Sequence, residues 1–166
     1  MNNTNLPEPV GAKERGANVN FPPPLVFAAA LVGGIVLRYT VGATPVPIAP
    51  VLRLVCGLAV MALGFGLVLS ARLHFLRTRQ SPIPWKPTPA LIFDGPYRFT
   101  RNPMYLGITL FLVGLGAASS VLWISILAVP ALAIVHYLAV LPEERYLSEK
   151  FGAAYAGFVE RVPRYL

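Results

Sequence analysis

Charge and cysteine are both scarce in this chain. Only 13 % of the 166 residues are charged, whereas 55 % are hydrophobic, and the mean hydropathy is +0.62. So few charges cannot cover a water-facing surface, and we therefore expect a lipid bilayer to be the solvent. The single cysteine, Cys56, excludes a disulfide within the chain, and its apolar neighbours favour a small buried side chain.

Motifs of several common site types are also missing. The two histidines lie far apart and no carboxylate-rich cluster accompanies them, so we expect no metal site. Glycine-rich phosphate loops and the GxSxG nucleophile motif are absent. The net charge of +7 comes from basic residues in short segments between apolar runs. That distribution favours loops that face anionic lipid and argues against a nucleic-acid partner.

Four apolar segments are candidates for membrane helices, at about residues 25–41, 54–73, 105–118 and 121–141. The last two lie in an uncharged run that predicts a helical hairpin. We expect its bend at Gly114, Gly116 and Ser119–Ser120, and a kink of the second arm at Pro130. In the second segment, Gly57, Gly64 and Gly66 predict close packing on a neighbouring helix. Three prolines predict a turn at residues 44–50.

Basic residues set the expected orientation. The connector at residues 72–101 contains a single acid, Asp94, among several arginines, so the positive-inside rule places it in the cytoplasm. Residues 143–166 have helical apolar spacing, which predicts an amphipathic helix on the cytoplasmic surface, broken near Gly152. Residues 1–20 are polar and lack the apolar core of a signal peptide, so we expect a flexible tail before a single domain at residues 21–166.

The expected fold is thus an all-α integral membrane protein with about four transmembrane helices plus the C-terminal amphipathic cytoplasmic helix. Both termini would then be cytoplasmic, and we expect the membrane to be a bacterial inner membrane.

The segment from Gly95 to Gly107 concentrates rings and hydrogen-bonding groups just before the hairpin. Tyr97 and Tyr105 can stack on a ligand, while Arg98 and Arg101 can bind a carboxylate or phosphate. The same residue types also form interfacial belts at membrane surfaces. From the spacing alone, the two interpretations have equal weight.

Glu143, Glu144 and His136 form a second candidate group. The acidic pair can cap a helix or bind a cationic ligand such as an amine or a sulfonium. His136, inside the apolar run, either lines a cavity or hydrogen-bonds a neighbouring helix. In a continuous helix, His136 and Glu143 would share a face. By elimination, these residues favour a loop-bound cofactor and a lipid-like substrate that arrives from the bilayer.

Two motifs here resemble those of integral-membrane methyltransferases, the isoprenylcysteine carboxyl methyltransferase and phospholipid methyltransferase group. The first is LIFDGPYRFTRNPMYLG, from Leu91 to Gly107. The second is Glu143–Leu147, followed by Phe151–Gly152, Tyr155 and Val162–Arg164. Their order is that of the family, and the resemblance makes residues 72–166 the expected cofactor-binding part.

The resemblance implies S-adenosyl-L-methionine as the cofactor, bound at the cytoplasmic face. The positions that it implies for binding are Pro89, Ala90, Leu91, Ile92, Tyr97, Asn102, Pro103, Met104, Tyr105 and Glu143, with Glu144 as the alternative to Glu143. We add candidate catalytic roles for Arg98 and Arg101, which can orient an acidic group of the acceptor, and for His136, which can accept a proton.

The chain departs from the eukaryotic pattern of the family at three positions. A histidine before proline is Asn102 here, which cannot titrate near neutral pH. A substrate-contacting arginine is Ala139, and a cofactor-contacting glutamine falls near Pro82, with Gln80 close by. We therefore expect a retained cofactor site and an altered substrate site.

The expected function is methyl transfer to a lipophilic or amphipathic acceptor, resembling isoprenylcysteine carboxyl O-methylation. An ethanolamine-type phospholipid N-methyltransferase is the alternative. A non-catalytic membrane scaffold and a nicotinamide-dependent membrane reductase are further hypotheses. The expected partners are the lipophilic or lipid-modified substrate and membrane lipids, without nucleic acid, and the sequence does not indicate an oligomeric state.

Overall fold

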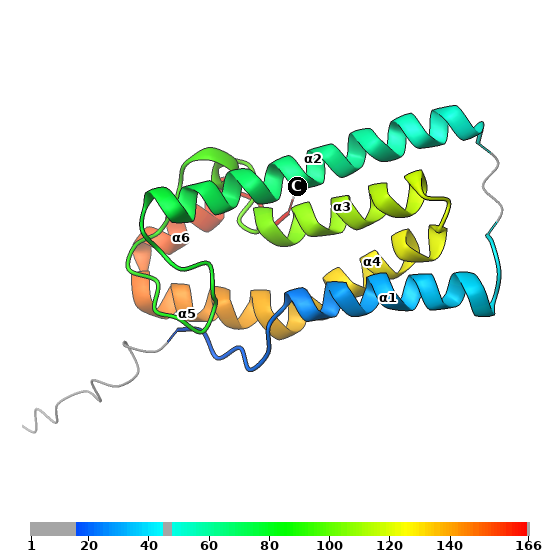
Figure 1. Cartoon of the computed structure of the whole chain (residues 1–166). Coiled ribbons are helices and arrows are strands. Elements are labelled where there is room, and N and C mark those ends of the chain that lie inside the picture. Colours follow the sequence, from blue (N-terminus) through cyan, green and yellow to red (C-terminus); the bar gives the residue numbers. More distant parts are fainter. Residues whose placement is uncertain (1–15, 45–47, 166) are drawn as a thin grey trace, which may run out of the picture.

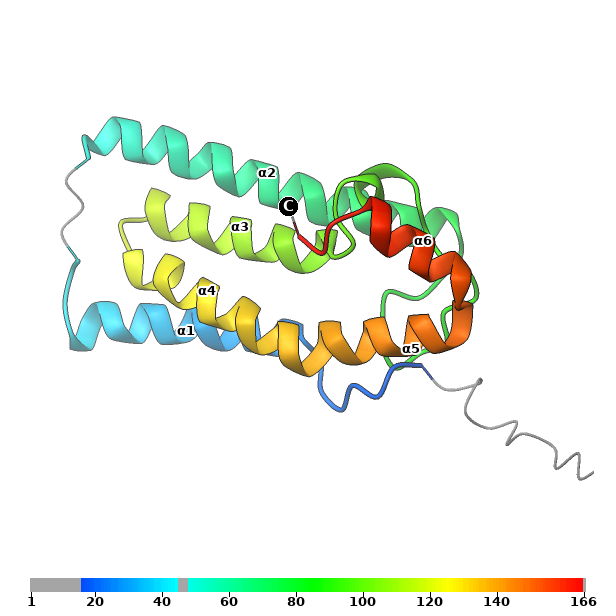
Figure 2. The ribbon, with the colours of Figure 1, turned by 180° about the vertical axis from the view of Figure 1, so that it is seen from behind.

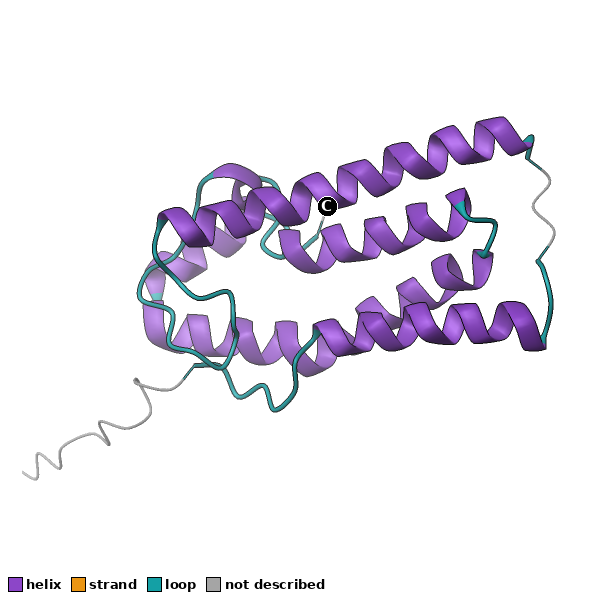
Figure 3. Ribbon diagram, viewed as in Figure 1, coloured by secondary structure: helices purple, strands orange, loops and turns teal. Residues whose placement is uncertain are grey.

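The computed structural model describes residues 16–44 and 48–165, and the regular structure in these ranges is entirely helical (Figure 3). The α-helices are α1 (Pro24–Thr40), α2 (Pro50–Arg77), α3 (Pro103–Ala118), α4 (Leu122–Val135), α5 (Leu141–Phe151) and α6 (Ala153–Arg161). A 3-10 helix, η1 (Gly95–Arg98), and a π-helical turn, η2 (His136–Val140), complete them. Helices α1 to α4 run alongside one another, with the connector, α5 and α6 gathered at one end (Figures 1 and 2).

In the described part of the chain, two helices are long and apolar enough to cross a membrane. They are α2 and the continuous helix Leu122–Phe151, which joins α4, η2 and α5. Helices α1 and α3 are apolar but shorter, with 17 and 16 residues. Large apolar side chains such as Leu63 and Val129 are exposed on these helices, as expected where lipid is the solvent. The all-helical expectation is confirmed, whereas the expectation of a buried Cys56 is wrong, because that residue is exposed on α2.

Proline and glycine mark most helix boundaries. Pro24, Pro50 and Pro103 are each the first residue of a helix, where the missing N–H group costs no hydrogen bond. Gly152 separates α5 from α6 with a φ of +49°, so the predicted break at this residue is confirmed. Pro130 lies inside α4, which continues through it.

Glycines bring α2 and α3 into backbone contact. A Cβ atom at Gly64 would lie 2.4 Å from the backbone nitrogen of Phe111, and one at Gly114 would lie 2.3 Å from that of Met61. The predicted close packing is confirmed for Gly57 and Gly64, but Gly66 faces open space. Gly114 therefore lies inside α3 and packs on α2, and does not form the hairpin bend.

The hairpin bend itself lies between α3 and α4, at Ser119–Val121. Ser120 adopts a φ of +62° there. Gly116, which we had also placed at the bend, lies inside α3, where a Cβ atom would be 2.3 Å from the Ser125 hydroxyl of α4. The bend is thus correctly predicted only for the two serines.

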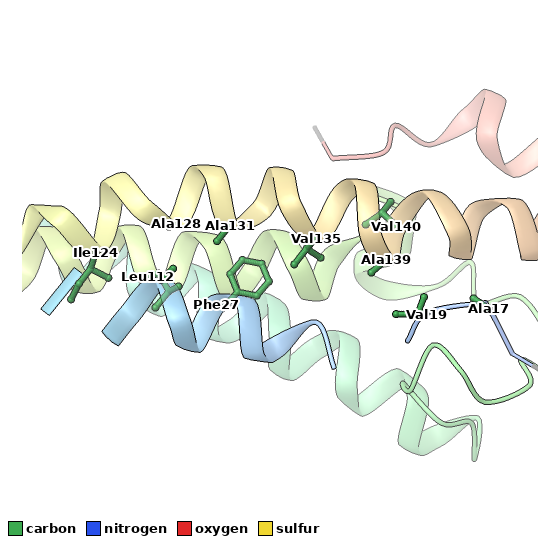
Figure 4. Packing of buried hydrophobic residues seen from close by; sticks show 11 residues of the cluster. Ala17, Val19, Phe27, Leu112, Ile124, Ala128, Ala131, Val135, Ala139 and Val140 are labelled. Carbon is green, nitrogen blue, oxygen red and sulfur yellow. The ribbon is translucent and has the colours of Figure 1, made fainter. Parts of the chain in front are cut away.

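The main core lies between α1 and α4. Phe27 of α1 packs among small and branched side chains of α4, including Ala128, Ala131 and Val135 (Figure 4). The alanines let the two helices approach closely. This core extends past η2 to Val19, which lies before α1.

Residues 16–20 belong to the folded part, although we had assigned them to the N-terminal tail. The N–H groups of Gly16 and Ala17 donate to the carbonyls of Trp85 and Pro84, at 3.3 and 2.8 Å. Ala17 and Val19 are buried. The rest of the predicted tail, and residues 45–47 of the predicted turn, lie outside the described residues.

The long helix Leu122–Phe151 is regular except at η2. The N–H of Leu141 donates to the carbonyl of His136, five residues back, and the turn is correspondingly wider. Pro142 follows directly; it lacks an N–H group, and its ring crowds the preceding turn of a regular helix. The wider turn accommodates this proline and rotates α5 relative to α4.

We predict that Gly64→Ala destabilises the protein by about 1–3 kcal/mol, because the added methyl group meets backbone atoms that cannot move aside. The measurement is thermal unfolding of the purified protein in detergent. Gly66→Ala is the matched control on the same helix, where nothing lies within 4 Å. Equal midpoints for the two variants would contradict the packing described here.

Candidate functional site

A cavity opens at the end of the molecule where α3 begins and α5 begins. It encloses about 1090 Å³, including its open mouth. Its walls come from the connector, η1, the first turns of α1 and α3, the start of α5, and α6. The cavity has a polar side near η1 and α5 and an apolar side that includes Ile108 and Val140.

Most of the residues proposed from the sequence line this cavity. They are Ala90, Leu91, Ile92, Tyr97, Arg101, Asn102, Pro103, Met104, Tyr105, Glu143 and Glu144. Three others do not line it, namely Pro89, Arg98 and His136. The cavity therefore unites the two sequence motifs, which lie about forty residues apart in the chain but face each other in the fold.

The two adjacent glutamates have different surroundings. Glu144 is bound by two arginines. Arg101 Nη1 lies 2.8 Å from its Oε1, while Arg164 donates from Nε to Oε1 at 2.9 Å and from Nη2 to Oε2 at 2.7 Å. The side chains of Arg101 and Glu144 are only 10 % and 14 % exposed. Charge-assisted hydrogen bonds of this kind fix a carboxylate firmly.

The surroundings of Glu143 are different. Among the described residues, no donor hydrogen-bonds to its carboxylate, which lines the cavity together with Tyr97 and Tyr105. Burial raises the pKa of the Tyr97 phenol well above its usual range, and the nearby Glu143 charge raises it further. Tyr97 therefore remains a neutral phenol beside an available carboxylate.

Tyr97 is held in place by the packing of η1 on α2. Gly95 begins η1 with a φ of +60°, and a Cβ atom there would lie 2.2 Å from the ring of His74. The Tyr97 ring meets the edge of Phe75 at a centroid distance of 6.0 Å. Glycine is thus required at position 95 by both its backbone angle and its contact, and its place in the motif has a structural reason.

The C-terminal segment, residues 162–165, closes the polar side of the site. The carbonyl of Arg164 accepts hydrogen bonds from Thr100 Oγ1 at 3.0 Å and from Asn102 Nδ2 at 3.2 Å. The N–H of Arg101 donates to the Pro163 carbonyl at 3.0 Å. Asn102 thus holds the C-terminal segment with the amide group that stands in place of the family's histidine.

Arg164 is the principal residue that our selection from the sequence missed. Its motif, Val162–Arg164, was visible, but nothing in the sequence indicated that its side chain reaches Glu144 on α5. The sequence did contain one signal. Arg164 belongs to the same motif as the acidic pair Glu143–Glu144, and a basic residue of that motif is a candidate partner for one of the two carboxylates.

Two buried polar atoms at the cavity have no partner among the described residues. They are Oε1 of Gln80 and Nε of Arg101. An acceptor and a donor left unpaired beside a cavity are suited to a ligand that offers complementary groups. Gln80 thus supplies an amide at the wall of the cavity, although the family's glutamine falls near Pro82 in this sequence.

His136 lies on a different side of the long helix from Glu143. Its Nδ1 is 3.0 Å from the Tyr165 hydroxyl, and it does not line the cavity. The expectation that His136 and Glu143 share a helical face is wrong, because the π-helical turn between them rotates α5. Ala139 is buried in the core beneath the site.

Among the described residues, no group of histidine, cysteine and carboxylate side chains suits a metal ion. A sequence profile of the phospholipid methyltransferase family matches residues 52–154, more than half of the chain. The chain belongs to this family. No curated protein sequence matches it.

Membership of the phospholipid methyltransferase family confirms that the chain is a membrane methyltransferase with lipid-type substrates. The matched region contains the connector with η1, followed by α3, α4 and the acidic pair at the start of α5. It ends before Tyr155 and Arg164, so the contribution of the C-terminal segment is known from the structure alone.

We predict that Arg164→Ala lowers the stability of the protein by about 1–2 kcal/mol, because Glu144 loses two of its three hydrogen bonds. Arg161→Ala is the matched control, since Arg161 is exposed and bonds only a carbonyl of its own helix. The measurement is thermal or denaturant unfolding, extended by a double-mutant cycle with Glu144→Gln. Additive effects of Arg164→Ala and Glu144→Gln would contradict the pairing.

Proposed function

We propose that this chain transfers a methyl group from S-adenosyl-L-methionine to the amine of a membrane lipid. The observation that carries the proposal is the Glu143 carboxylate, which faces the cavity without a partner among the described residues. A carboxylate in that position attracts a cationic ligand, and this cofactor carries both a sulfonium and an ammonium group. The membership of a methyltransferase family supports the same cofactor.

The cavity's residues fit the cofactor group by group. The Glu143 carboxylate and the unpaired Gln80 Oε1 are acceptors for ammonium and hydroxyl groups, and the unpaired Arg101 Nε is a donor for a carboxylate. Tyr97 and Tyr105 offer aromatic rings to a nucleoside or a sulfonium. Residues 90–92 line the same cavity. Pro89 lies outside it, and we leave Pro89 out of the proposed site.

When bound, the cofactor supplies an electrophilic methyl group on a sulfonium that is already a good leaving group. The protein therefore needs to align the acceptor and exclude water more than it needs to activate the methyl group. Tyr97 and Tyr105 form the wall that keeps water out. Arg101 and Arg164 hold Glu144, so Glu143 is the carboxylate that remains to orient the cationic groups.

The charges at the cavity favour an amine as the acceptor. Both arginines at the polar side are already bound to Glu144, and Glu143 is unpaired among the described residues. A carboxylate acceptor of the isoprenylcysteine type would meet this like charge, and the Arg101 Nε donor is already assigned to the carboxylate of the cofactor. A lipid amine of the ethanolamine type would meet no like charge, and it is the acceptor that we propose.

We further propose that α1, α2, α3 and the helix Leu122–Phe151 all cross the membrane. Helices α1 and α3 are about 25 Å long at 1.5 Å per residue, slightly less than the hydrocarbon thickness. Four crossings with the basic connector inside place the cavity and both termini in the cytoplasm. We propose a bacterial inner membrane, as expected from the sequence, and an acceptor that reaches the cavity from the cytoplasmic leaflet.

We predict that Glu143→Gln weakens the binding of S-adenosyl-L-methionine at least tenfold, because the substitution removes the charge but keeps the shape of the side chain. The measurement is calorimetric titration of the purified protein in detergent. Glu149→Gln, an exposed change on the same helix, is the matched control and leaves the affinity unchanged. Wild-type protein that binds neither the cofactor nor its demethylated product would exclude a methyltransferase that uses it.

We predict that membranes containing the protein and radiolabelled cofactor form a methylated lipid whose label survives mild base. An N-methyl group is stable to base, whereas a methyl ester is hydrolysed. Extracted lipids are treated with base and the volatile label is counted. Membranes with the Glu143→Gln variant provide the background. Label that is released as methanol would identify a carboxylate acceptor and overturn the amine assignment.

A further inference from the structure

Of the two arginines in the first motif, Arg101 lines the cavity and Arg98 does not. Arg98 is exposed on η1, and no described residue accepts a hydrogen bond from its side chain. Helix η1 has two sides, since Tyr97 lines the cavity while Pro96 and Arg98 line a separate, open groove. The groove therefore lies across η1 from the proposed cofactor site.

The groove runs along the outer face of α2. Its floor consists of small and apolar side chains at helical spacing, including Ala59, Ala62 and Gly66, and it reaches Ser70. At 1.5 Å per residue this floor is roughly 16 Å long. Phe99, which is 71 % exposed, forms a wall at the end near η1. The groove holds about 1340 Å³, including its open side.

The charge at one end of the groove identifies the kind of ligand. None of its described lining residues is acidic, and Arg98 lies at the end formed by η1. Arg77 is exposed and lies seven and eleven residues beyond Ser70 and Gly66, on the same face of α2. Among the described residues, neither arginine has an ion-pair partner. A long apolar floor with Arg98 at one end, and with Arg77 further along the same helix face, matches an acyl chain that ends in a phosphate.

We propose that this groove binds an anionic phospholipid, with its acyl chain along α2 and its phosphate at Arg98. The phospholipid is distinct from the methyl acceptor, because the two concavities lie on opposite sides of η1 and share no lining residue. A lipid held there rests against the helix that carries Tyr97. The site does not depend on the proposed reaction, only on the exposure of this face to the bilayer.

The test is lipid binding by the purified protein in detergent, followed by native mass spectrometry. Phosphatidylglycerol and phosphatidylcholine with the same acyl chains are titrated in parallel. We expect one tightly held phosphatidylglycerol, and Arg98→Gln lowers its affinity about fivefold, as one interfacial charge would. Ala62→Leu, which fills the floor, lowers the affinity for both lipids. Arg72→Gln is the matched control, an exposed arginine of α2 on nearly the opposite side of the helix.

Thermal unfolding of each variant shows whether it is folded, so a loss of binding is assigned to the groove only in a folded variant. Equal binding of the two lipids by the wild-type protein overturns the proposal. So does an equal loss with Arg98→Gln and Arg72→Gln, which would indicate a diffuse charge effect. A dimer that dissociates on Ala62→Leu, without any change in lipid binding, would assign the groove to a second copy of the chain instead.

Discussion

The ion pairs at Glu144 join three parts of the chain that are distant in sequence. Arg101 comes from the segment before α3, Glu144 from α5, and Arg164 from the C-terminal segment. Each of these groups would be costly to bury alone, and together they satisfy one another. These ion pairs fix the distance between the segment before α3 and the start of α5. The cavity is the space that remains between those two parts of the chain. The ion pairs also separate the roles of two neighbouring glutamates, since one is used for structure and the other remains available to a ligand.

Close packing of the helices next to the cavity fixes the positions of the residues that line it. Helices α2 and α3 touch backbone to backbone at their glycines, and α1 rests on the alanines of α4. In lipid, association of helices depends on such close packing, because apolar side chains gain little by leaving an apolar solvent. The N-terminal segment adds to this support by pairing its backbone with the connector at Pro84 and Trp85. The polar end of the molecule is thus supported by four closely packed apolar helices.

The fold and the site were predictable to different extents. Helix positions followed from apolar runs and prolines, so the predicted segment 105–118 differs from α3 by two residues at one end. The positions of individual side chains could not be predicted from these features. Arg98 and Arg101 look equivalent in the sequence, yet in the fold Arg98 lies at the groove along α2 and Arg101 lies at Glu144. That difference arises from the packing of η1 on His74 and Phe75, which is a tertiary contact and leaves no local pattern. Arg164 was missed for the same reason.

The π-helical turn at residues 136–140 has a consequence for how such a protein can diverge. One residue in an α-helix corresponds to about 100° of rotation. Removing one residue from this wide turn would leave four residues to complete it, as in a regular α-helix, so α5 and both glutamates would keep nearly their present orientation. The same deletion elsewhere between α4 and α5 would rotate α5 about its axis. The wide turn is therefore a place where this helix can lose a residue while the glutamates still face the loop.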